Sequence, residues 1–188
     1  MKFRSIVWLT TTAATLLGST YMSQAQTKEK TVMVGGAPMY PSKNIVENAV
    51  NSKDHTTLVA AVKAAGLVET LQGKGPFTVL APTNSAFAKV PEDALSSLMM
   101  PENKAKLTSI LTYHVIPGKW SADQIMKAIK EGNGIYETKT VQGGKLTFWR
   151  KGNEVYVKDA QGNSAKVTIA DVNQSNGVIH VIDGVLMP

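Results

Sequence analysis

The chain has 188 residues, with 20 Lys and Arg against 14 Asp and Glu, a formal net charge of +6 and no cysteine. The lack of cysteine excludes disulfides, cysteine nucleophiles and thiolate metal sites. The basic residues are spread along the chain, which argues against a nucleic-acid partner and leaves a small allowance for acidic polysaccharide.

Residues 1–25 have the pattern of a secretory signal peptide. Lys2 and Arg4 give a positive start, residues 6–18 are mostly apolar, and small residues precede a cleavage position after Ala25. Cleavage leaves 163 of the 188 residues, one domain's worth, with a net charge of +4 because the leader holds two basic residues and no acidic one. No stretch reaches the roughly 20 apolar residues of a membrane span. We therefore expect a secreted or periplasmic protein without an integral membrane span.

The next segment, residues 26–43, mixes charges, a glycine pair and two prolines without a period, and we expect an N-terminal arm lying along the domain. The domain itself is expected over residues 44–188. Apolar residues then recur every three to four positions over 45–50 and 58–65, which predicts two short helices, the second ending at Gly66.

A short buried strand is predicted at Phe77–Ala81, because this apolar run lies between two prolines. Asn84 is expected to cap a short helix after it, and Pro91 to open another. Helical periodicity returns around residues 107–111, before a short isolated strand at Val115.

The last third of the domain changes from helices to hairpins. Ser121 and Gln124 form a capping-box pattern, which predicts a helix over residues 121–130. Strand-length runs follow, separated by glycine turns, at 137–141, 145–150, 154–158 and 164–172, with a closing strand at 178–182. Helices first and hairpins second predict an α+β fold with a mostly antiparallel sheet sealed by helices.

Three separated stretches resemble the conserved blocks of the fasciclin domain in order and approximate spacing. They are GPFTVLAPTNSAF (75–87), LTYHVIPG (111–118) and NGVIHVIDGVLMP (176–188). The resemblance covers about residues 44–188 and implies a wedge-shaped, mostly antiparallel β-sandwich flanked by a cluster of helices. It also implies a non-enzymatic role in extracellular adhesion, with a cell-surface or matrix protein or a polysaccharide as partner. The signal and the stand-alone domain indicate a bacterial source.

The family's adhesion motifs give a candidate binding site. Tyr113 and His114 match the Tyr-His dipeptide that is implicated in integrin binding in animal matrix members, and Asp171-Val172 takes the place of a second motif that ends in Asp-Ile. The flanking residues of that second motif are absent. His114 is either a structural residue at a helix-to-strand corner or part of a binding face.

Four other motif residues are interpreted as structural. Thr83 and Asn84 start a helix, while His180 and Asp183 belong to a closing strand whose two faces are both apolar. A buried imidazole on such a strand needs a backbone carbonyl or a hydroxyl as a hydrogen-bond partner.

Catalytic patterns do not emerge from the sequence. No Gly-x-Ser-x-Gly elbow surrounds Ser85, and the three histidines lack metal-ligand spacing, so we predict no enzyme activity, no cofactor and no metal.

Trp120, Trp149 and Tyr156 either stack on sugar rings or pack across strands. The alternative function is therefore a polysaccharide- or small-ligand-binding protein of the cell envelope. Tight adhesion by one module requires a homo-oligomer or a polyvalent target.

Overall fold

The computed structural model describes residues 30–188. The expected signal peptide and the first residues of the arm lie outside this described part. Within it, no helix has both the length and the apolar character needed to cross a membrane. The elements are, in order, β1 (Val32–Val34), β2 (Ala37–Met39), α1 (Ile45–Ala49), η1 (Lys53–His55), α2 (Thr56–Ala65), α3 (Val68–Gln72), β3 (Phe77–Pro82), α4 (Asn84–Phe87), α5 (Glu92–Leu98), η2 (Pro101–Asn103), α6 (Lys104–Tyr113), β4 (Val115–Pro117), α7 (Ala122–Glu131), β5 (Ile135–Lys139), β6 (Lys145–Lys151), β7 (Glu154–Lys158), β8 (Ser164–Gln174) and β9 (Gly177–Ile182).

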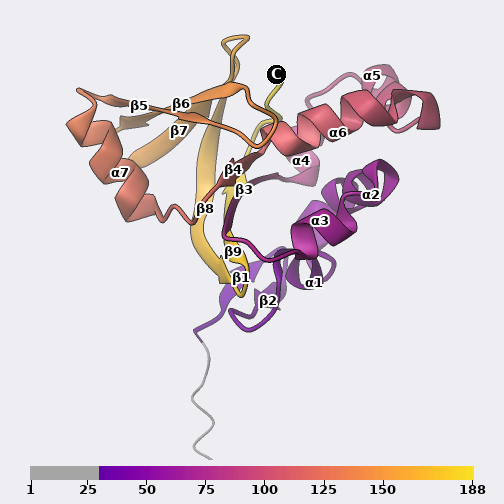
Figure 1. Ribbon diagram of the computed structural model, residues 1–188, viewed down its shortest axis with the longest axis horizontal. Helices are drawn as coiled ribbons and strands as arrows, with labels where there is room; N and C mark the ends of the chain where they lie inside the picture. The colour runs from indigo at the N-terminus through magenta and orange to yellow at the C-terminus, as the bar shows by residue number, and fades with distance from the viewer. Residues whose placement is uncertain (1–29) are drawn as a thin grey trace, which may run out of the picture.

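Seven strands form one bent sheet in the order β4-β3-β9-β8-β7-β6-β5 (Figure 1). Within that sheet β3 and β9 pair in parallel and every other pair is antiparallel, which confirms the predicted α+β, mostly antiparallel class. The first part of β8 pairs with β7 and the rest with β9. Register shifts on either side of Ile169 bend β8, because a bulge bends a strand. This bend allows one strand to pair with β7 at its start and with β9 along the rest of its length.

The two ends of the sheet approach each other. The backbone N–H of Val141, just after β5, donates to the carbonyl of Val115 in β4 at 2.7 Å. The sheet is therefore nearly closed into a barrel, and α7 packs against β5 and β6 with Ile125 and Ile129 in the core of that barrel.

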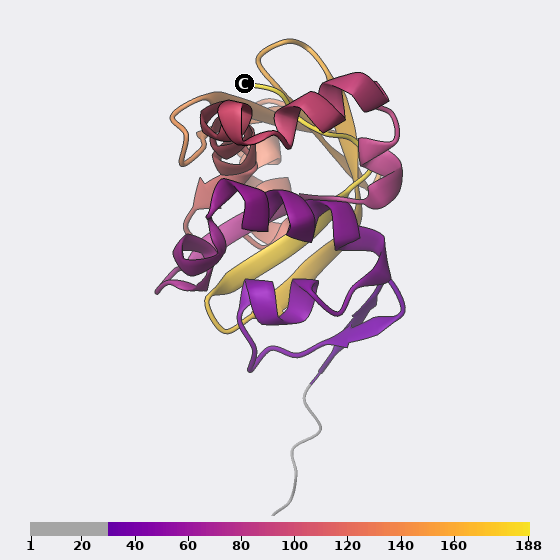
Figure 2. The ribbon, with the colours of Figure 1, turned by 90° about the vertical axis from the view of Figure 1, so that its right-hand side faces the viewer.

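Two apolar cores lie on opposite sides of the central strands β3 and β9. Val79 and Ala81 of β3 face the helical core, which β3 and β9 build with α1–α4 and α6, while Leu80 faces the barrel core, enclosed by β5–β8 and α7. All six residues of β9 are buried, since this strand is covered on both faces. Helices α1–α3 cover one face of these strands (Figure 2).

The N-terminal arm is more structured than its sequence predicts. Val32–Val34 and Ala37–Met39 pair as a hairpin across Gly35-Gly36, whose φ angles are 57° and 76°. Val34 and Met39 are each 3% exposed and belong to the helical core. The hairpin was missed because each of its strands has only three residues, which is too short for an alternating pattern.

Helix caps follow the sequence patterns with one exception. Ser121 and Gln124 form the predicted capping box of α7, and Gly66 ends α2 with φ 74°. The prediction that Asn84 caps α4 is wrong, because Thr83 occupies that position and its Oγ1 accepts from the Ala86 N–H at 3.2 Å. Thr and Asn both serve as N-caps, and the stronger intrinsic preference for Asn predicted the wrong one of these two neighbours.

Candidate functional site

Tyr113, the last residue of α6, lies inside the barrel core and is 0% exposed. Its hydroxyl donates to the carbonyl of Lys145 at 2.6 Å and accepts from the N–H of Ala160 at 3.0 Å. A Cβ on Gly144 would lie 2.5 Å from the Tyr113 ring, so this position has no room for a side chain. Tyr113 therefore links α6 to two hairpin loops and is not available for surface contact.

His114 follows directly and is 3% exposed. Its Nε2 accepts from the backbone N–H of Leu186 at 3.0 Å, so the ring proton is on Nδ1, which donates to the carbonyl of Ile110 at 2.8 Å. Burial lowers the pKa of His114 to about 4, although the bond to Ile110 and the carboxylate of Asp159 act in the opposite direction. The ring is thus a neutral bridge between α6 and the C-terminal segment.

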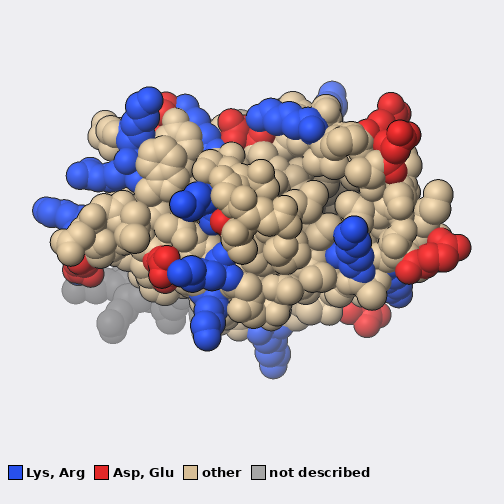
Figure 3. Space-filling view, turned by 90° about the horizontal axis from the view of Figure 1, so that it is seen from above, with Lys and Arg blue, Asp and Glu red and all other residues tan. Residues whose placement is uncertain are grey.

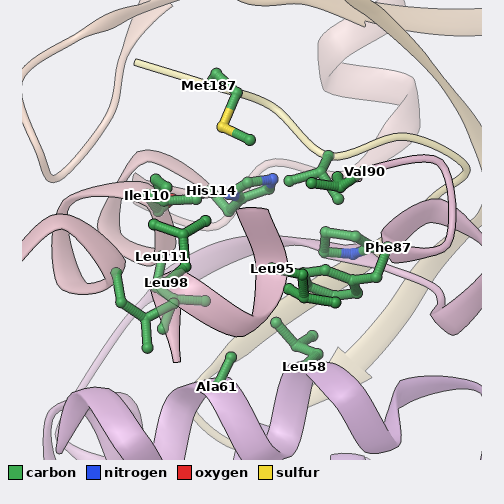
Figure 4. Close-up of a pocket in the computed structure, with 13 residues that line it drawn as sticks. Leu58, Ala61, Phe87, Val90, Leu95, Leu98, Ile110, Leu111, His114 and Met187 are labelled. Atoms are coloured by element: carbon green, nitrogen blue, oxygen red, sulfur yellow. Dashed lines mark hydrogen bonds between the residues drawn. The ribbon is translucent and has the colours of Figure 1, made fainter. Parts of the chain in front are cut away.

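Asp159 bonds to the same C-terminal segment, one residue beyond the bond that His114 makes with Leu186. This carboxylate is 4% exposed and accepts from the backbone N–H groups of Gln161, Asn163 and Met187. Figure 4 shows the Met187 side chain directed toward His114, and both residues line an apolar cavity that reaches Leu58 on α2. Sequence reasoning missed Asp159. Its spacing to Gly162-Asn163 signals the turn, but the contact with Met187 has no local signal.

His180 and Asp171 form a second connecting cluster. His180 is 1% exposed; its Nε2 donates to the carbonyl of Trp120 at 2.7 Å, and its Nδ1 accepts from the N–H of Asp171 at 3.3 Å. Asp171 lies in the bulge of β8 with φ 57°, and its carboxylate accepts from the first N–H of α7, at Ala122, at 2.8 Å. Burial lowers the pKa of His180.

The remaining motif residues also bond to the backbone. Asn84 Oδ1 accepts from the N–H of Thr57 at 3.0 Å, in the first turn of α2, and its amide donates to the carbonyl of Lys53 at 2.9 Å. Asp183 accepts from the N–H of Lys166 at 2.7 Å, which fixes the end of β9 to β8. Val172 is 1% exposed in the helical core. The structure therefore does not gather Tyr113, His114, Asp171 and Val172 into one exposed surface.

The third histidine, His55, is also buried, and burial lowers its pKa. Its Nδ1 lies 2.9 Å from the hydroxyl of Ser52, while its Nε2 has no hydrogen-bond partner among residues 30–188. Across this described part of the chain, no three His, Asp or Glu side chains form a group that could hold a metal ion.

The three candidate sugar-stacking residues do not form one surface, because Trp120 lies apart from Trp149 and Tyr156. Trp120 packs against Tyr136, with ring centroids 5.2 Å apart, beside the barrel core. Trp149 and Tyr156 face each other on the opposite side of β6 and β7 and stack at 4.5 Å with planes 16° apart. One face of each of these two rings is thus occupied by the other ring. Both side chains are half-buried, so the pair packs across the strands and still has part of its surface open to solvent.

Comparison with known protein sequences identifies relatives along most of the chain. The Fasciclin domain family model matches residues 53–188. Protein sll1483 of Synechocystis sp. is 48% identical over 167 residues, which cover 89% of this chain and 86% of that protein. Immunogenic protein MPB70 of Mycobacterium bovis is 38% identical over 145 residues, which cover 74% of this chain and 66% of that protein.

A solved structure shows the same fold at low sequence identity. It is a FAS1 domain pair from the insect cell adhesion molecule Fasciclin I, with a TM-score of 0.70 and 19% identity. The match covers 79% of this chain and 52% of that chain.

Proposed function

We propose that this chain, which belongs to the fasciclin domain family, is a non-enzymatic adhesion or surface-association module that is secreted or periplasmic. Its relatives include the cell surface glycolipoprotein MPB83 of Mycobacterium bovis, which is 36% identical over 146 residues, and its fold matches about half of a FAS1 domain pair from an insect cell adhesion molecule. The signal-peptide pattern of residues 1–25 supports export.

The burial of the motif residues is the observation that carries this proposal. Tyr113, His114 and His180 use their polar atoms on backbone groups of the same chain, and their burial keeps them from a substrate. The three blocks that resemble the family thus maintain the fold. Binding then falls to the outer surface of the domain, as in an adhesion module.

The alternative of a small-ligand-binding protein receives less support from the cavities. Three apolar cavities around Leu58 have volumes of about 20, 30 and 40 Å³. Sites for small ligands are roughly 300 Å³ or larger. A wider groove of about 530 Å³ beside α4 and α5 is open to solvent. Because the enclosed cavities are small and the groove is open, a polysaccharide, which can bind along an exposed surface, is better supported as a partner than a small ligand.

Attachment of cells is the direct test. We expect cells that lack the gene to attach less to surfaces and to one another, and the full-length gene to restore attachment. A gene without the codons for residues 2–25 serves as the control and should not restore it, because the protein would stay inside the cell. Attachment at the original level in cells without the gene would contradict the proposed function.

A further inference from the structure

The outer side of β5–β8, opposite the barrel core, carries a concentration of positive charge. Alternation along β6 places Leu146 and Phe148 in the core and the odd-numbered residues outside. The cross-strand pairs extend this outer side over the neighbouring strands. We call it the lysine face, and it comprises Ile135, Glu137, Lys139, Lys145, Thr147, Trp149, Lys151, Glu154, Tyr156, Lys158, Ser164 and Lys166.

The lysine face has five lysines and two glutamates, which gives a net charge of +3. Lys145 pairs with Glu137 at 2.7 Å, and Lys166 pairs with Glu154. Lys139, Lys151 and Lys158 take part in none of the ion pairs within residues 30–188. In the view from above, basic side chains gather over the end of the molecule that carries β5–β7, and acidic ones mark the opposite end (Figure 3).

One pair on this face is unfavourable for the folded protein alone. Lys139 lies directly opposite Lys145 in the register of β5 and β6. Like charges at such positions destabilise a sheet, and the exposed Glu137 offsets little of this repulsion. A bound anion would relieve it, so the pair indicates a negatively charged partner.

An apolar row crosses the lysine face. Ile135, Trp149 and Tyr156 are consecutive cross-strand neighbours, and Ile135 is 50% exposed. Neither aromatic residue belongs to one of the two cores. Lys158 lies in the row on one side and Lys151 in the row on the other, about 7 Å away along each strand. A ligand lying along this row would contact apolar atoms in the middle and ammonium groups at both margins.

We propose that the lysine face binds an acidic polysaccharide, with its carboxylate or sulfate groups on the lysines and the C–H groups of its sugar rings against Ile135 and the aromatic pair. This inference rests on the proposed function and names the partner class of the binding surface. Trp149 and Tyr156 stack on each other, so each offers at most one face to a ligand, whereas proteins that bind single-stranded nucleic acid present separate aromatic faces to successive bases. A sugar chain can place the C–H groups of one ring against the face of this pair that the stacking leaves uncovered, and against the neighbouring Ile135. The three apolar cavities and the open groove described above are lined by other residues, so none of them gives the lysine face a deep pocket in which a protein partner could bury an anchor residue.

The charge requirement is tested with fluorescent polygalacturonate at low ionic strength, using the chain from residue 26 onward. The triple variant Lys139→Gln, Lys151→Gln, Lys158→Gln should bind about tenfold more weakly or worse. The matched control is Lys63→Gln, Lys104→Gln, Lys106→Gln, which removes the same charge from α2 and α6 and should change the affinity less than about twofold. Equal losses in the two triple variants would overturn the assignment of the site.

The apolar row is tested by Trp149→Ala, with circular dichroism to verify the fold. We expect about fivefold weaker binding of polygalacturonate and a smaller change for polyglutamate, which has the carboxylates without sugar rings. Dextran sulfate distinguishes sulfate from carboxylate, and neutral dextran should not bind. Tighter binding of polyglutamate or of single-stranded DNA than of either acidic polysaccharide would overturn the proposal.

The attachment assay separates this inference from the proposed function. If cells without the gene attach poorly and the Lys139, Lys151, Lys158 triple variant restores attachment fully, the lysine face is not the binding surface and the adhesion role stands. If the triple variant also fails to restore attachment while the control triple variant succeeds, both proposals are supported.

Discussion

His114 and His180 each use one ring nitrogen as donor and the other as acceptor, and in both the acceptor receives a backbone N–H. The N–H of Leu186 points at His114, and that of Asp171 points at His180. A second proton on either ring would therefore face a donor that cannot accept it. The neutral imidazole suits this role because it offers one donor and one acceptor on opposite sides of a rigid ring.

Removal of the His114 ring should destabilise the protein without a direct effect on binding. His114→Ala leaves the N–H of Leu186 and the carbonyl of Ile110 unpaired, which costs about 1 to 3 kcal/mol in the free energy of unfolding. His114→Asn places an amide near the position of Nδ1 and should recover part of the loss. Urea denaturation measures both variants. A melting temperature equal to wild type together with lost attachment would instead place His114 in the binding site.

The lowered pKa of His114 predicts loss of stability in mild acid. The unfolded chain binds a proton near pH 6.5 and the folded one only near pH 4, so stability falls as the pH decreases through this interval. From pH 7 to pH 5 the expected loss from His114 is about 2 kcal/mol, and the lowered pKa of His180 adds a loss of the same sign. Urea denaturation at the two pH values should show a smaller difference in His114→Asn. An undiminished pH dependence in this variant would contradict the assignment to His114.

At the scale of elements, the sequence predicts what local chemistry determines. The capping box at Ser121, the stop at Gly66 and the glycine hairpins at positive φ are all present as expected. The partners of side chains that reach across the chain could not be predicted. Asn84 bonds to residues 53–57, and Asn176 accepts from Ile45 and donates to the carbonyl of Leu71, over separations that no local pattern records. The same limit applies to the candidate site. The sequence identifies Tyr113 and His114 as a motif but does not reveal that both side chains point inward.

Asn84 is the first residue of α4 and also bonds to the first turn of α2. Its replacement should therefore destabilise the start of α2. Asn84→Ala removes the acceptor for the N–H of Thr57, which is equivalent to deleting a cap of α2 and should cost about 1 to 2 kcal/mol. Asn84→Asp keeps the acceptor oxygen for the N–H of Thr57 and loses the amide's bonds to the carbonyl of Lys53 and the hydroxyl of Thr56, so it should cost less. Hydrogen exchange of the amides in the first turn of α2 measures the effect. Faster exchange in α4 alone would contradict this role.

On the scale of the whole molecule, the helical core contains three small apolar cavities that all adjoin Leu58. Leu58→Ala should join them into one larger void and cost about 3 to 5 kcal/mol. The matched control, Leu98→Ala, affects a partly exposed side chain that lines one of the three and should cost less. Calorimetry of the Leu58→Ala variant with and without benzene checks the void, because an apolar cavity of sufficient size binds such a molecule and the melting temperature then rises. An unchanged melting temperature in benzene would show that the helices collapse into the space.

The parallel pairing of β3 with β9 joins positions 100 residues apart, since Phe77 lies opposite Gly177. Both cores depend on this pair, because β3 and β9 contribute side chains to each. During synthesis, a chain that emerges from its N-terminus makes β3 long before β9 exists, and neither core can close in the interval. Pairings over such distances also form slowly after the chain is complete. The fold therefore stays unfinished until the last strand has been made, and a transport machinery that accepts only unfolded chains would have that whole interval in which to engage this one.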